Sequence, residues 1–244
     1  MIVEAKSRST YFRTRPAPCD DGRVVGLHHG YTNDTRRLRA GVVEKKYAGS
    51  DAADRSAREY LCLSRLSDRL PVPRVIDRDA SVPALTLAEV QGTHGQDAID
   101  AGNAAETLRL IGSLLRRLQG LDPASVPGLT GVGDVIVHGD FGPQNVLIDD
   151  SRVSALLDWE FAHIGSAVED LAWAEWIVRM HHPRDVGSLP ELFRAAQAAP
   201  AWNDRQAAMV GRCRELLGRA ERAGSDGAID LWRRRTRRTE RWRE

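Results

Sequence analysis

The stretch VIVHGDFGPQNVLIDD, residues 135–150, limits the possible folds of this chain more than any other part of the sequence. Two short apolar runs, residues 135–137 and 146–148, enclose a loop that contains two glycines and one proline. A third apolar run, residues 154–157, follows after a turn. This order predicts three strands joined by a sharp loop and a turn. Polar side chains at the strand ends would then converge on one spot.

Three polar residues in this context suit phosphoryl transfer. Asp140 follows the first strand, Asn145 lies in the loop, and Asp158 ends the third strand. The reaction needs one carboxylate to accept or orient the proton of the attacking hydroxyl, and other oxygen ligands to hold Mg²⁺ against the phosphates. Asn145 offers a neutral ligand, which avoids like-charge crowding around the aspartates. Taken singly, Asp140 also fits an Asx turn and Asp158 a strand-end cap.

The letters Asp140-Phe141-Gly142 look like the metal-binding DFG of protein kinases, but Asp140 and Asn145 have the spacing of a kinase catalytic loop. Asp140 cannot fill both roles. Asp158, 18 positions later, takes the place of the separate metal-binding aspartate. We therefore interpret the literal DFG as a coincidence.

The motif HGD-x4-N, followed by LLDWE, resembles the aminoglycoside phosphotransferase family, the small-molecule branch of the protein-kinase-like fold. The resemblance implies that Asp140 is the catalytic base and that Asn145 and Asp158 are metal ligands. It extends to GSAVEDLAWAEW, which is similar to the GDPxxDLA segment of the family, although GSA stands where GDP is usual. Only Asp170 carries over there, and we interpret it as a structural anchor for the loops.

The rest of the chain is consistent with an α+β, bilobal, protein-kinase-like fold. Residues 1–91 are predicted to form a β-rich nucleotide-binding lobe, and residues 92–244 a larger, mostly helical lobe for catalysis and acceptor binding. In the first lobe we expect a hairpin with strands at residues 24–27 and 38–43 and a turn at 28–35. We also expect one helix at 51–70 and two further strands at 75–76 and 84–90. In the second we expect a core helix at 104–121 and helices from Asp170 onward.

Lys45 is the predicted phosphate-binding cation of the first lobe. Strand alternation places Val43, Lys45 and Tyr47 on one face and Lys46 on the other, so we prefer Lys45, although two solvated strand lysines remain the alternative. Glu59 in the following helix is the matching carboxylate by resemblance, or else a solvated helical glutamate.

The segment LTLAEVQG, residues 85–92, resembles the hinge of the family. The resemblance implies that backbone groups near Glu89 and Val90 meet the adenine of the nucleotide. HHGYTNDT, residues 28–35, looks like the phosphate-covering turn, but it lacks GxGxxG.

Charge and composition narrow the partners. The formal net charge is only +1, which argues against nucleic acid because a phosphate backbone calls for a basic face. No run approaches the roughly 18 apolar residues of a membrane span, and the first 20 residues lack the apolar core of a signal peptide. Three scattered cysteines without CxxC favour reduced thiols. We expect a cytoplasmic protein with no membrane partner.

The acceptor is less well defined. Glu160, Glu169 and Glu175 are candidates for an acidic lining, yet residues 161–244 contain 12 Asp and Glu against 15 Arg, so no strongly acidic cleft is evident. The arginine-rich residues 232–244 favour a solvated helix end, or alternatively a surface for an anionic partner.

The sequence thus predicts a Mg²⁺-dependent phosphotransferase. It would move the γ-phosphoryl group of ATP or GTP to a hydroxyl of a small molecule, with an antibiotic, amino alcohol, sugar or peptide antibiotic as candidate acceptors. The alternative is a pseudokinase that binds nucleotide without turnover. The joint presence of Lys45, Asp140, Asn145 and Asp158 argues against that alternative.

Overall fold

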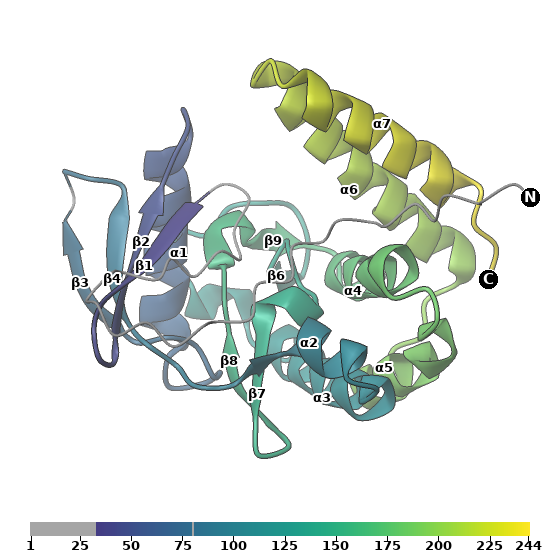
Figure 1. The fold of residues 1–244 in the computed structure, drawn as a ribbon, viewed down its shortest axis with the longest axis horizontal. Helices are drawn as coiled ribbons and strands as arrows, with labels where there is room; N and C mark the ends of the chain where they lie inside the picture. The colour runs from purple at the N-terminus through teal and green to yellow at the C-terminus, as the bar shows by residue number, and fades with distance from the viewer. Residues whose placement is uncertain (1–32, 80) are drawn as a thin grey trace, which may run out of the picture.

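The computed structural model describes residues 33–79 and 81–244, and Figure 1 shows their arrangement. An antiparallel sheet formed by the first described residues, purple and blue in Figure 1, stands beside a larger part that is mostly helical. The predicted α+β class is therefore confirmed. The predicted strand at 24–27 and residues 28–32 of the predicted turn lie outside the described residues.

Within residues 33–79 and 81–244, the N-terminal sheet has four strands in the order β1-β2-β4-β3. They are β1 (Asn33–Arg39), β2 (Val42–Tyr47), β3 (Val75–Asp79) and β4 (Ala84–Ala88). Between β2 and β3 runs α1 (Ala52–Leu66), which contacts β2, β3 and β4. The sheet and α1 together position Lys45 and Glu59.

The hairpin prediction was wrong in its register. Residues 33–35 belong to β1 rather than to a turn, and the predicted strand 38–43 is broken at residues 40 and 41. Gly41 has φ +74, a left-handed conformation that glycine adopts without a steric cost. Apolar residues stand on both sides of this glycine, so their pattern resembles that of one continuous strand.

The core of the helical part is built around α3 (Ala104–Gln119), whose predicted position is confirmed. Its apolar side chains are almost completely buried: Leu108, Ile111, Leu114, Leu115 and Leu118. Gly112 lets α5 (Leu189–Ala196) approach closely, because a Cβ at that position would lie 2.3 Å from the carbonyl oxygen of Leu192. One continuous buried cluster joins α3 to Tyr47 and Leu85 of the sheet. The division between residues 91 and 92 stays a prediction.

Short strands lie between these two parts and frame the site. β6 (Val135–Val137) pairs with β9 (His163–Gly165), and β7 (Val146–Asp149) lies between β5 (Thr93–His94) and β8 (Arg152–Leu156). The sequence predicted β6, β7 and β8. It did not predict β5, β9 or the short helix α2 (Gly95–Asp100), which are too short for a periodic pattern to show.

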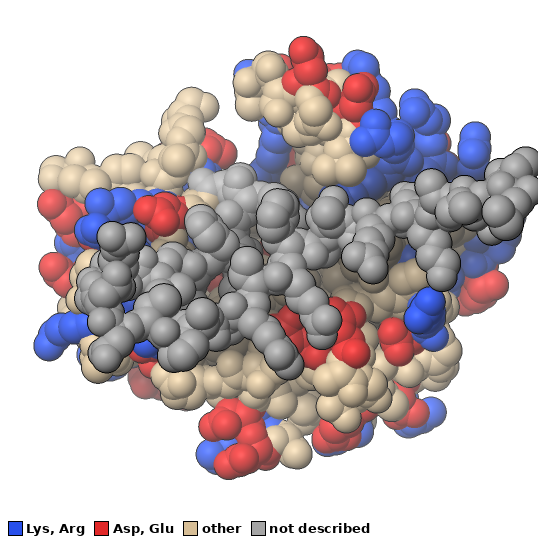
Figure 2. All heavy atoms as spheres, viewed as in Figure 1, with Lys and Arg blue, Asp and Glu red and all other residues tan. Residues whose placement is uncertain are grey.

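The C-terminal region is helical, as expected, in four separate segments. α4 (Val168–His181) and α5 are followed by the antiparallel neighbours α6 (Trp202–Arg222) and α7 (Asp226–Glu240). Lys and Arg side chains gather over α6 and α7 at the upper right of Figure 2. Trp232 of α7 packs with Trp173 and Trp176 of α4 in a second buried cluster. Among the described residues no helix is long and apolar enough to cross a membrane.

Candidate active site

The loop after β6 is held in place by Asp170 of α4. The two carboxylate oxygens of Asp170 accept hydrogen bonds from the backbone amides of His138 and Gly139, at 2.7 and 3.0 Å. Asp170 is 1% exposed, so its role as an anchor of this loop is confirmed. Gly139 has φ +81, and a Cβ there would lie 2.4 Å from the carbonyl oxygen of Phe161. A glycine is therefore required at this position.

His138 joins the loop to the end of β8. Its Nε2–H donates to the carbonyl of Leu157 at 2.9 Å, and its Nδ1 accepts from the amide of Asp140 at 3.2 Å. This pair of bonds defines a neutral imidazole. Burial lowers the pKa of His138 to about 4, in agreement with that state. The imidazole thus fixes the aspartate-bearing loop against the strand that leads to Asp158.

Asp140 receives a donor on each carboxylate oxygen. Trp173 Nε1 donates to Oδ1 at 2.8 Å, and Asn145 Nδ2 donates to Oδ2 at 2.9 Å. Burial, with the nearby negative charge of Asp158, raises the pKa of Asp140 to about 6. The carboxylate is thereby oriented, and it is more basic than an ordinary aspartate. The sequence predicted that Asn145 lies near Asp140, but it did not predict the contact with Trp173.

Asp158 meets the charged residues of the first sheet. Lys45 Nζ donates to Asp158 Oδ1 at 2.6 Å and to Glu59 Oε2 at 2.5 Å. Burial lowers the pKa of Lys45, but the charges of Asp158 and Glu59 outweigh it and raise that pKa overall, so the amine stays protonated. The structure thus joins three predicted residues from β2, α1 and the end of β8.

The placement of the two adjacent lysines agrees with strand alternation. Lys45 is 8% exposed and lies over the ring of Tyr47, whose hydroxyl donates to Glu59 at 2.7 Å. The side chain of Lys46 is 46% exposed and lies near Glu44. The predicted orientation of both side chains is confirmed.

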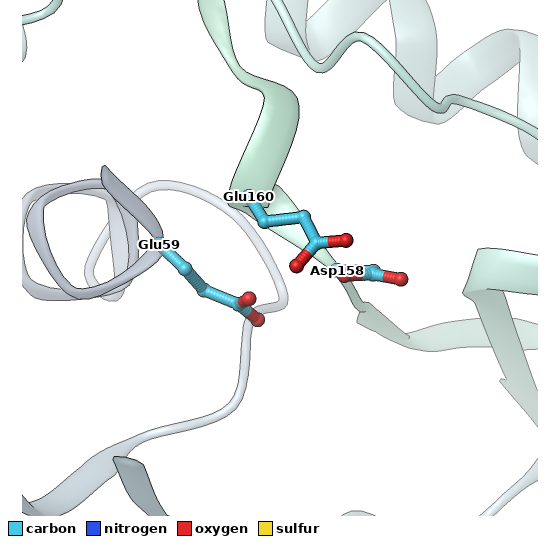
Figure 3. A group of neighbouring side chains, drawn as sticks. All are labelled: Glu59, Asp158 and Glu160. Atoms are coloured by element: carbon cyan, nitrogen blue, oxygen red, sulfur yellow. The ribbon is translucent and has the colours of Figure 1, made fainter. Parts of the chain in front are cut away.

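Figure 3 shows a third carboxylate beside Asp158 and Glu59, that of Glu160. Oxygen atoms of the three residues lie within 4.8 Å of one another. Glu160 is 1% exposed and accepts from Arg55 Nη1 at 2.8 Å and Asn33 Nδ2 at 2.7 Å. The suggestion that Glu160 lines an acceptor cleft is therefore wrong: its carboxylate points into this buried network.

The cluster contains the kind of ligand that Mg²⁺ takes in proteins, namely carboxylate and amide oxygens. Glu59 and Glu160 are held by Lys45, Tyr47, Arg55 and Asn33. Among the described residues no donor reaches Asp158 Oδ2, and Asn145 uses its amide nitrogen toward Asp140. Asp158 and Asn145 therefore keep oxygen atoms for a cation, and their chemistry fits this ion.

The segment after β4 has contacts with the β1–β2 turn. The Glu89 amide donates to the Gly41 carbonyl at 3.0 Å, and its carboxylate pairs with Arg37. Val90 is half-buried. The role of this backbone in adenine binding stays a prediction.

A cavity of about 500 Å³ opens beside the loop that carries Asp140. Its lining includes Gly139, Phe161 and Trp173, and it carries three arginines, Arg58, Arg212 and Arg219. Of the three suggested acidic residues only Glu169 lines it. Glu175 is completely buried and pairs with Arg179 and Arg205, so its suggested place at the acceptor is wrong.

Comparison with known proteins gives the family. The model of the phosphotransferase enzyme family APH matches residues 23–134 and 130–209. The site and the fold define a kinase-like phosphotransferase, and the chain belongs to this family.

Individual relatives support the fold. The GDP and kanamycin complex of APH(2″)-IIIa superposes with a TM-score of 0.73 at 13% identity, covering 90% of this chain and 93% of that one. The macrolide 2′-phosphotransferase MphH from Brachybacterium faecium gives 0.64 at 16% identity, covering 92% and 94%. Hygromycin-B 4-O-kinase from Escherichia coli is 35% identical over 22% of this chain and only 19% of its own length. The protein-kinase-like fold is thereby confirmed.

Proposed function

We propose that this protein transfers the γ-phosphoryl group of ATP or GTP to a hydroxyl of a small acceptor. The observation that carries the proposal is the contact of Lys45 with both Glu59 and Asp158, next to the oriented carboxylate of Asp140. Lys45, Glu59 and Asp158 come from distant parts of the chain, and the negative charge of Asp158 acts on Asp140. Phosphoryl transfer depends on this kind of fixed charge, because the protein acts mainly by positioning and electrostatic stabilisation.

Asp140 is the proposed base. Its carboxylate accepts the proton of the acceptor hydroxyl as the oxygen forms a bond to the γ-phosphorus, and the bond from that phosphorus to the bridging oxygen breaks. The products are the phosphorylated acceptor and a nucleoside diphosphate. A pKa raised to about 6 brings the base closer to the operating pH, which favours general base catalysis.

Lys45 is proposed to bind the α- and β-phosphates, with Glu59 orienting its ammonium. Asp158 and Asn145 would hold Mg²⁺, which neutralises charge on the phosphates when it is bound. Backbone groups near Glu89 and Val90 would receive the adenine or guanine base. Residues 1–91 would then form the nucleotide lobe, and residues 92–244 the catalytic lobe.

The relatives suggest the kind of acceptor. Their names mention hygromycin B, kanamycin and macrolides, so an antibiotic with a free hydroxyl is a reasonable first class to test. Because nucleoside triphosphates are found inside cells, we propose that the reaction takes place in the cytoplasm.

The test is a Mg²⁺-dependent turnover assay with ATP and with GTP, run against a panel of hydroxyl compounds that includes aminoglycosides, macrolides, sugars and amino alcohols. Detection of the phosphorylated product by ³¹P nuclear magnetic resonance shows transfer rather than hydrolysis. Asp140→Ala serves as the control for catalysis. Nucleotide binding without transfer to any member of the panel would favour the pseudokinase alternative and contradict the proposal.

A further inference from the structure

The cavity beside the catalytic loop has a chemical character that the phosphotransferase assignment does not explain. Three arginines line it, Arg58, Arg212 and Arg219, together with three carboxyl groups, Glu169, Asp170 and Glu215. The formal charges of the two groups balance. The two groups differ in how many of their hydrogen-bonding atoms already have a partner in the protein.

Every oxygen of the three carboxyl groups has a donor within the protein. Asp170 accepts from two backbone amides, and Glu169 accepts from the amide of Ser166 at 2.7 Å and from His163 at 2.9 Å. Glu215 accepts from Arg212 at 2.6 Å and from Arg219 at 2.7 Å, one on each oxygen. These groups are poorly available to a cationic ligand.

Most N–H groups of the three arginines have no acceptor among the described residues. A guanidinium has five N–H groups, and each of the three arginines makes one hydrogen bond among the described residues: Arg212 and Arg219 to Glu215, and Arg58 to the carbonyl of Glu160 at 2.7 Å. For Arg212 the side chain is 14% exposed, and its Nε is buried with no acceptor in the described part of the chain. A buried donor without an acceptor costs free energy, and a ligand oxygen in the cavity would bond to the other N–H groups of this guanidinium, because Nε is buried.

Two aromatic rings hold these cations close to the base. The Arg212 guanidinium lies 5.3 Å from the ring centre of Phe161 and 5.8 Å from that of Trp173. Arg219 lies 4.3 Å from the ring centre of Phe161. Trp173 donates to Asp140, so the arginine cluster is one aromatic side chain away from the proposed base. Asp140 itself is not in the lining of the cavity, but its neighbour Gly139 and its hydrogen-bond donor Trp173 are.

We propose that the acceptor carries an anionic group, such as a carboxylate, which binds Arg212 and Arg219 while its hydroxyl faces Asp140. The planar guanidinium matches a carboxylate with two parallel N–H bonds. A polycationic acceptor would instead meet these arginines with like charge. The proposal rests on the proposed function, since it names the acceptor class of the same site.

Ligands of similar size and different charge test the proposal. Two series are suitable: glucuronate, glucose and glucosamine, and hydroxyphenylacetate, tyrosol and tyramine. Binding of each to the full chain is measured by calorimetry. We expect the carboxylate member of at least one series to bind most tightly, about tenfold or more above its neutral partner, and the amine to bind most weakly. Tightest binding by the amines, or no preference for either carboxylate, would overturn the inference.

Variants locate the effect. Arg212→Gln and Arg219→Gln should each weaken binding of the preferred carboxylate about tenfold and leave the neutral member unchanged. Arg214→Gln is the matched control, because Arg214 lies on the same helix but is 66% exposed and pairs with Glu240. If Arg212→Gln fails to fold, Arg219→Gln alone decides, since that side chain is 31% exposed. Unchanged carboxylate binding in a folded variant would contradict the proposal.

Turnover with the same ligands separates this inference from the proposed function. Phosphorylation of the amine members in preference to the carboxylates would overturn the anionic acceptor and leave the phosphotransferase in place. A carboxylate preference in binding without phosphoryl transfer to any acceptor would support the arginine site and contradict the proposed function.

Discussion

The two sides of the site use their charges in opposite ways. On the side of β2 and α1, Lys45 contacts Glu59 at 2.5 Å and Asp158 at 2.6 Å, and Arg55 holds Glu160 beside them. On the cavity side, Arg212 and Arg219 share a single carboxylate, that of Glu215, and stack on Phe161. The first network is closed in the sense that each of its charges pairs with an opposite charge of the protein, although Asp158 Oδ2 stays available. The second network leaves guanidinium N–H groups without a partner among the described residues.

This difference indicates which side of the site can vary in its ligand specificity. In a closed network each charge depends on its neighbours, because a buried charge that loses its partner is costly. Such a network suits the binding of a phosphoryl donor that a whole family of enzymes shares. An open cluster of donors completes its bonding with a ligand, so it suits the group that distinguishes one acceptor from another. The following changes test this contrast, from the largest expected effect to the smallest.

Asp158→Asn is expected to have the largest effect. It keeps the shape of the side chain but removes the charge that pairs with Lys45 and would hold the metal, so Mg²⁺-dependent nucleotide turnover should fall to background, further than in any variant below. Turnover and circular dichroism measure activity and fold. Asp149→Asn, at an exposed strand end, is the control. Wild-type activity in Asp158→Asn would refute the assignment.

Asp140→Ala should lower kcat by about 10²–10⁴-fold, the usual contribution of a general base, while Mg²⁺-nucleotide affinity stays close to normal. Turnover kinetics with calorimetric titration of the nucleotide separate the two quantities. A loss of nucleotide affinity as large as that of Asp158→Asn would mean that Asp140 holds the metal instead of the proton.

Lys45→Ala should raise KM for the nucleotide and lower kcat, because a charge-assisted bond to phosphate contributes roughly 1.5–3 kcal/mol. Lys45→Arg should also raise KM and lower kcat, since a planar guanidinium does not fit where Glu59 and Asp158 enclose a compact ammonium. Lys46→Ala is the matched control and should change stability by no more than about 0.5 kcal/mol. Steady-state kinetics measure KM and kcat of each variant, and wild-type values in Lys45→Arg would contradict the prediction.

Trp173→Phe should have the smallest effect. It removes the N–H that orients Asp140 but keeps an aromatic ring at the edge of the cavity, so kcat should fall about fivefold, as expected for about 1 kcal/mol of hydrogen bonding. Trp176→Phe is the control: its Nε1 donates to the hydroxyl of Thr239 at 2.8 Å, away from the loop. Equal losses of kcat in the two variants would show that Trp173 acts only through packing.

Patterns local to one element carried over well from sequence to structure. The helical spacing of Leu108, Ile111 and Leu115 predicted α3, and strand alternation placed Lys45 inward and Lys46 outward. The hairpin failed because Gly41, which turns the chain, lies between two runs that both read as strand. Local patterns describe which face a residue occupies, and they lose their meaning where a single residue reverses the chain.

The sequence alone determined the family motifs and the positions of Asp140, Asn145 and Asp158 along the strands, because their spacing is a property of neighbouring residues. Only the tertiary structure decided which side chains meet them. Trp173 reaches Asp140 across 33 positions, Arg55 reaches Glu160 across 105, and Lys45 reaches Asp158 across 113. Contacts over such separations depend on how whole elements pack, and packing is set by the burial of the core rather than by the identity of the residues that it brings together.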